Sequence, residues 1–144
     1  MGRDGLYLAN ATVLITHQID AAFWHEWDLF GLPGGAPLFV LTNLPIVFAV
    51  LWGAQALAHG RVGGIVMSWA LVASGAIAIG LHGVFLASGH VAFRAPVSLG
   101  LLAATGVLSL AQASVLLLSR DVRLSRPPNE RSHGVRSETR AGRT

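Results

Sequence analysis

Three long apolar segments most restrict what this chain can fold into. They run from residue 37 to 58, from 62 to 88 and from 96 to 118, with glycine and arginine residues between them. A helix needs about 20 mainly apolar residues to cross roughly 30 Å of hydrocarbon, and each segment has this length. Charged residues make up only 12% of the chain, against about 25% in soluble domains. The sequence therefore predicts a multi-pass membrane protein.

A fourth and more polar segment, from about residue 5 to 30, is expected to form one further membrane-spanning helix. At about 100° per residue, its polar and aromatic side chains fall within about 80° of one another. These side chains are Asn10, His17, Asp20, Trp24 and Asp28. Such a stripe is typical of a membrane helix whose polar side faces other helices.

The last apolar segment carries a second polar stripe, at spacings of seven, four and three residues: Ser98, Thr105, Ser109 and Gln112. Polar side chains between membrane helices form interhelical hydrogen bonds, and small residues let the helices approach closely. The candidates for packing or for lining a pocket are Asn10, Trp24, Asn43 and Gln112. The expected fold is all-α, an integral membrane four-helix bundle with a disordered C-terminal tail.

The tail, residues 119 to 144, is strongly basic. It holds seven of the ten arginines but only three of the seven acidic residues. Its composition predicts disorder, and its charge predicts a cytoplasmic location beside anionic lipid headgroups. With four spans, both termini would be cytoplasmic. No groove-reading motif accompanies the arginines, so nucleic acid is not an expected partner.

Ionisable residues concentrate between positions 17 and 28, at the outer end of the predicted first helix. An Asp near the membrane centre costs about 2.5 to 3.5 kcal/mol on insertion scales, so Asp20 requires a partner. His17, one turn earlier on the same face, is the nearest candidate. A structural interpretation is that the two form a buried pair that holds helix register, while His25, Glu26 and Asp28 lie at the membrane interface.

The chemical interpretation is a site for an ion or a metal. At 1.5 Å per residue, His17 lies about 18 Å from the inner end of its helix and His82 about 30 Å from the inner end of the third. This mismatch predicts an outer-leaflet cluster without His17 and argues against a bis-histidine haem. The cluster comprises Asp20, Trp24, His25, Glu26, Asp28, His82 and His90. Its ligand types suit zinc or iron, although the spacing matches no metal motif.

Two classes of function fit these residues. The first is an accessory or binding protein with a polar pocket between the first and third predicted helices, near the outer leaflet, that associates with other membrane subunits or with copies of itself. The alternative is a membrane-embedded, metal-dependent enzyme or an ion or proton conductor that uses His17, Asp20, Glu26 and His82. No phosphate-binding loop or nucleophile motif supports phosphoryl or acyl transfer.

The run from Thr16 to Gly35 resembles an uncharacterised family of small bacterial integral membrane proteins. In that family a His-x-Ile-Asp element precedes a Trp-x-Glu-Trp-x-Leu-Phe-Gly-Leu-Pro-Gly-Gly element, and this chain has both. The residues that carry the resemblance are His17, Asp20, Trp24, Glu26, Trp27, Pro33 and the glycines. The resemblance implies a multi-pass membrane protein of unknown function in a bacterial inner membrane, and it assigns no catalytic residue.

Overall fold

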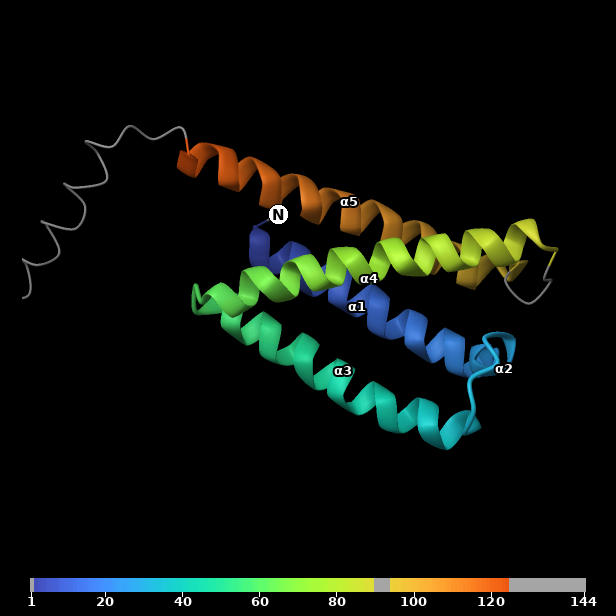
Figure 1. Cartoon of the computed structure of the whole chain (residues 1–144). Coiled ribbons are helices and arrows are strands. Elements are labelled where there is room, and N and C mark those ends of the chain that lie inside the picture. Colours follow the sequence, from blue (N-terminus) through green and yellow to red (C-terminus); the bar gives the residue numbers. More distant parts are fainter. Residues whose placement is uncertain (1, 90–93, 125–144) are drawn as a thin grey trace, which may run out of the picture. The chain divides into compact units, whose positions relative to one another are not determined.

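A computed structural model describes residues 2–89 and 94–124, and every regular element in these two ranges is an α-helix (Figure 1). The chain divides into two compact units, Met1–Ala113 and Ser114–Thr144. The helices are α1 (Arg3–Phe23), α2 (Glu26–Leu29), α3 (Gly35–Ala58), α4 (Val62–Ala87) and α5 (Pro96–Leu124). The core and the candidate site described below belong to the first unit.

Three of these helices are long and apolar enough to cross a membrane: α3, α4 and the Pro96–Ser119 part of α5. They correspond to the three apolar segments of the sequence. Many of their large apolar side chains point away from the protein, and Phe48 on α3 is 71% exposed. Contiguous apolar surface of this kind marks contact with a membrane or with another protein.

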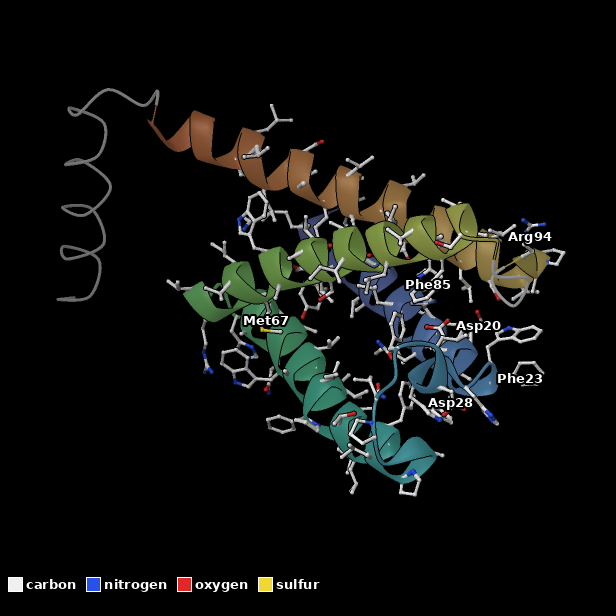
Figure 2. All side chains as sticks on the ribbon, turned by 45° about the vertical axis from the view of Figure 1, so that its right-hand side comes forward. Asp20, Phe23, Asp28, Met67, Phe85 and Arg94 are labelled. Atoms are coloured by element: carbon white, nitrogen blue, oxygen red, sulfur yellow. The ribbon has the colours of Figure 1, made fainter. Side chains whose placement is uncertain are left out.

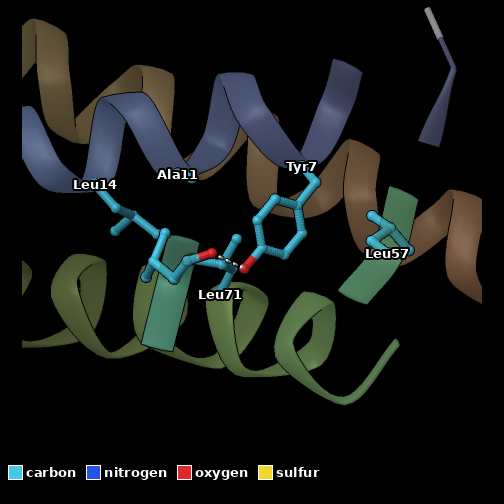
Figure 3. Close-up of a cluster of buried hydrophobic side chains, with 6 residues drawn as sticks. Tyr7, Ala11, Leu14, Leu57 and Leu71 are labelled. Atoms are coloured by element: carbon cyan, nitrogen blue, oxygen red, sulfur yellow. Dashed lines mark hydrogen bonds between the residues drawn. The ribbon is translucent and has the colours of Figure 1, made fainter. Parts of the chain in front are cut away.

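A cluster of buried apolar side chains joins α1 to α3 and α4 (Figure 3). The Tyr7 hydroxyl lies within this cluster, where it donates a hydrogen bond of 2.8 Å to the Val50 carbonyl. A fully buried hydroxyl requires such an acceptor. The cluster consists of Tyr7, Ala11 and Leu14 from α1, Val50 and Leu57 from α3, and Leu71 from α4.

Glycines lie where the helices approach most closely. A Cβ atom added to Gly64 on α4 would overlap the backbone of Leu57 on α3. A Cβ atom on Gly75 would overlap the Ser109 hydroxyl on α5. These positions agree with the expected close approach of helices through small residues.

Polar side chains of α1 and α5 bond to each other. The Asn10 amide donates to Gln112 Oε1 at 2.7 Å and to Ser109 Oγ at 3.3 Å, and Asn10 is fully buried. The Gln112 amide in turn donates to the carbonyl of Ser68 on α4 at 3.4 Å. The sequence named Asn10 and Gln112 as candidates for an interhelical hydrogen bond, and this hydrogen bond is present.

The prediction of a single helix from residue 5 to 30 was wrong. The first helix ends at Phe23, and His25 has a φ angle of +51°, in the left-handed region. The short helix α2 then lies at the C-terminal end of α1 (Figure 1). No glycine or proline marks this break. The bend instead accompanies the burial of Glu26 and Trp27, both at most 7% exposed.

Helix α2 ends in a tight backbone motif that turns the chain toward α3. The Leu32 N–H donates a hydrogen bond of 2.8 Å to the Trp27 carbonyl, and the Gly31 N–H donates one of 3.2 Å to the Asp28 carbonyl. With Gly31 at φ +62°, this is the Schellman arrangement, which favours glycine at the left-handed position. The turn after residue 30 therefore follows α2, and not one long first helix as the sequence predicted.

Helix α5 continues six residues past its predicted end at residue 118 and stops at Leu124. The start of the tail at residue 119 was therefore placed too early. Charged residues end an apolar segment, but they do not end a helix, because the backbone hydrogen bonds do not depend on them. Residues 125–144, and with them most of the expected disordered tail, lie outside the described ranges.

Candidate metal centre

Three buried ionisable side chains from three different helices meet at one point. They are His17 from α1, Glu26 from α2 and His82 from α4, with exposed fractions of 6%, 5% and 4%. One ring nitrogen of each histidine and one carboxylate oxygen of Glu26 all lie within 4.8 Å of one another. Buried ionisable groups are costly unless they are paired or bind a cation, so this convergence requires a chemical explanation.

The orientation of His82 is set by its own helix. Its Nδ1 lies 2.9 Å from the Ala78 carbonyl, and its Nε2 lies 3.2 Å from Glu26 Oε1. A carbonyl can only accept a hydrogen bond, so Nδ1 carries the hydrogen and a neutral ring presents its Nε2 lone pair to Glu26. The Nε2 lone pair and the carboxylate oxygen, 3.2 Å apart, repel each other unless a proton or a metal cation lies between them.

His17 completes the cluster from the α1 side. Its ring meets the His82 ring edge-on, with 4.9 Å between the ring centroids and 63° between the planes. Its Nδ1 is buried, and no residue in the described ranges bonds to it. A buried ring nitrogen in this situation is available to a ligand that the protein alone does not supply.

One separation between ligand atoms of the cluster suits a zinc-like ion. Bonds of about 2.0 to 2.2 Å in a tetrahedral arrangement place neighbouring ligand atoms about 3.4 Å apart. The separation of His82 Nε2 from Glu26 Oε1, 3.2 Å, is close to this value. The Ala78 carbonyl supplies the outer hydrogen bond that orients a histidine ligand and fixes its tautomer.

The expected depth mismatch between His17 and His82 was wrong, because it was counted from the inner ends of the two helices and assumed that these ends lie at one depth. Since α1 ends at Phe23, His17 lies six residues before its end, about 9 Å. His82 lies five residues before the end of α4 at Ala87, about 8 Å. Both histidines are therefore at one level, and the chain reversal after Phe23 brings Glu26 back to them.

A cavity of about 230 Å³ adjoins the cluster, and all three cluster residues line it. Most of its remaining wall is apolar, including Trp27, Phe30, Phe39 and Leu81. Trp27 is held there by Phe39, with 5.2 Å between ring centroids, and Phe30 is held by Phe85 at the same separation. The cluster thus lies on the polar side of a largely apolar cavity.

The other ionisable candidates do not join the three-residue cluster. Asp20 is half-buried, and one of its oxygens is buried with no hydrogen-bond partner in the described ranges. His25 and Asp28 are exposed, and His25 stacks on Trp27 instead. Figure 2 shows Asp20, Phe23 and Asp28 at the end of the unit where α2 lies. His90 lies outside the described residues.

The uncharged candidates serve packing or the surface. Trp24 is 36% exposed and is not among the residues that line the cavity. Asn43 donates to the Phe39 carbonyl within α3 at 2.9 Å. Asn10 and Gln112 bond each other elsewhere in the unit.

Gln18 and Trp27 are two of the cavity residues that the sequence did not assign to the site. Gln18 lines this cavity and also a second one of about 170 Å³ between α1, α3 and α4. A polar glutamine directly after His17 in the sequence could have indicated that Gln18 lines the same site. Trp27 had only a weak signal, because a tryptophan near a helix end is as typical of a membrane interface as of a cavity wall.

Together, the helices define an all-α protein with three potential membrane spans and a buried His/His/Glu cluster. The chain belongs to a family of unknown function, DUF6713, whose model matches residues 4–119. The expected membership of an uncharacterised family is thereby confirmed. No curated protein and no solved structure matches the chain.

Proposed function

We propose that this protein is a multi-pass membrane protein that binds one divalent transition-metal ion, with Zn²⁺ as the best fit, through His17, Glu26 and His82. In this proposal the pocket expected between the first and third predicted helices is the cavity between α1, α2 and α4. The observation that carries the proposal is the 3.2 Å approach of the His82 Nε2 lone pair to the Glu26 carboxylate.

A shared proton is the competing explanation for this short approach. It accounts for Glu26 and His82 but gives no role to His17, whose buried Nδ1 has no hydrogen-bond partner in the described ranges. A metal ion uses all three side chains, each through one atom. Two neutral histidines and a carboxylate also form a common ligand set of zinc sites that retain one open position.

Metal titration of the detergent-purified, tag-free chain tests the proposal. Isothermal titration with Zn²⁺ is expected to give one equivalent for the unmodified protein. His17→Ala or His82→Ala is expected to weaken binding by more than about 100-fold, the upper range for changing an outer partner of a ligand. His59→Ala is the matched control, because His59 is exposed and lies outside the cluster. Less than a tenth of an equivalent in the unmodified protein would refute the proposal.

The proposal includes α1 as a fourth membrane span. Its 21 residues reach about 31 Å, which matches the hydrocarbon thickness. Its most polar inward residues, Asn10 and His17, are buried. Thr12 and Thr16 are exposed but bond carbonyls of their own helix at 2.8 Å. Each feature lowers the cost of placing this helix in lipid.

Labelling of single cysteines tests the four-span topology, since the chain has no cysteine of its own. Arginine placement predicts cytoplasmic termini, so Gly2→Cys and His59→Cys are expected to react only from the cytoplasmic side. Leu32→Cys, which replaces an exposed residue after α2, is expected to react from the outside. Reaction of Gly2→Cys and Leu32→Cys from the same side would show that α1 does not cross.

A further inference from the structure

The three-residue cluster leaves a bound metal ion incompletely coordinated. Only three residues in the described ranges bring ligand atoms within 4.8 Å of one another. Asp20 does not belong to this group, and His25 and Asp28 are exposed. Structural zinc sites are closed by four protein ligands, whereas sites with three protein ligands bind an external molecule in the fourth position.

We infer that the open position of this metal faces the 230 Å³ cavity and binds a small monocarboxylate with an apolar end, such as a short-chain fatty acid. This inference rests on the proposed function. The cluster residues and the apolar wall line the same cavity, so a molecule bound to the metal there has its remaining atoms among Trp27, Phe30, Phe39 and Leu81.

Charge favours an anion at this position. A divalent ion with the Glu26 carboxylate and two neutral histidines has a net charge of +1, and all three ligands are at least 94% buried. An uncompensated buried charge is strongly unfavourable in a low-dielectric environment. Asp20 is the nearest additional carboxylate on α1, but it does not belong to the group whose ligand atoms meet, so it does not coordinate the metal. A carboxylate ligand neutralises the site directly.

Size and wall chemistry favour a short ligand with an apolar end. The cavity volume of about 230 Å³ corresponds to roughly eight water-sized units of about 30 Å³ each. Butyrate, with six heavy atoms, is of this size. Each added methylene that leaves water for the apolar wall is expected to tighten binding about fourfold.

Titration of the Co²⁺-loaded, detergent-purified chain with carboxylates tests the inference, because visible absorption bands of Co²⁺ respond to changes in its ligands. We expect saturable spectral changes with acetate, propionate and butyrate, with the dissociation constant falling about fourfold per methylene. Azide, an anion without an apolar end, is expected to bind no more tightly than acetate.

A cavity-filling variant provides the matched control. Ala21 is buried, lines the cavity and is not a ligand, so Ala21→Leu is expected to retain the Co²⁺ bands and to lose the advantage of butyrate over acetate. Loss of the Co²⁺ bands in this variant shows a distorted site, and Ile77→Phe then fills the same cavity from α4.

The outcomes separate the two proposals. Co²⁺ bands that no anion alters would overturn the open position while leaving metal binding intact. Equal affinity for acetate and butyrate would overturn the apolar-ended ligand. Failure of the chain to bind Co²⁺ at all would overturn the proposed function and this inference with it.

Discussion

Saturating the purified protein with Zn²⁺ is expected to raise its free energy of unfolding by about 4 kcal/mol when free Zn²⁺ exceeds the dissociation constant a thousandfold. The size of the effect follows from where the ligands come from. His17, Glu26 and His82 lie on three different helices, so only the folded chain brings them together. A ligand that binds the folded state alone adds its binding free energy to stability.

Glu26→Gln is the decisive variant for this prediction. The amide has the shape of the carboxylate, and its NH₂ group can donate to the His82 Nε2 lone pair, so the metal-free fold is expected to retain its stability. The variant lacks the charged oxygen ligand, so the Zn²⁺-dependent increase is expected to fall to near zero. Denaturation by SDS, followed through tryptophan fluorescence with and without Zn²⁺, measures both quantities.

The shared-proton explanation predicts the opposite pattern. Zn²⁺ would then leave the stability of the unmodified chain unchanged. Glu26→Gln would then have no Zn²⁺-dependent increase to remove, and its metal-free stability would not separate the two explanations, because both place a proton between Glu26 and His82 when no metal is bound. Observation of that pattern would assign the cluster a structural role.

Gly64→Ala is expected to lower the free energy of unfolding by about 3 kcal/mol, at the upper end for overpacking a core. The added Cβ atom would overlap the backbone of Leu57. A side chain in that place could change rotamer, but a backbone can yield only if α3 and α4 separate. The separation would also open the Tyr7 cluster, to which Leu57 belongs.

Gly80→Ala is the matched control on the same helix. No atom lies within 4 Å of a Cβ atom placed at Gly80, and alanine is the better helix former by about 1 kcal/mol. This variant is expected to be as stable as the unmodified chain or more so in the same SDS titration. Equal losses at Gly64 and Gly80 would show that glycine flexibility, rather than close packing, explains the effect.

Local signals in the sequence were enough to predict most of the helices. The turn between α3 and α4 was expected at His59 to Arg61, and Gly60 has a φ angle of +64° there. Its backbone bonds, from Arg61 to Ala56 and from Gly60 to Leu57, both 2.9 Å, form a Schellman motif. The polar stripe of the last segment was also predicted correctly as one face, since Ser98, Thr105, Ser109 and Gln112 are all buried.

The site was only partly predictable. The sequence named His17, Glu26 and His82 among several candidates, and it expected Glu26 and His82 at one level. It separated His17 from them, because counting residues along an uninterrupted helix places Glu26 more than two turns beyond His17. No glycine or proline in the sequence indicates the break at Trp24 and His25. Residue spacing alone therefore placed His17 and Glu26 too far apart.

The sequence by itself determined the long apolar helices, the glycine turns and the polar face of each helix. These features have local causes, because the spacing of apolar residues along a helix and the backbone freedom of glycine depend only on neighbouring residues. Only the tertiary structure decided the end of α1 at Phe23 and the meeting of His17, Glu26 and His82. That end depends on burying Glu26 against His82 and Trp27 against Phe39. These partners, His82 and Phe39, lie on other helices, so no sequence pattern within residues 17 to 28 could indicate them.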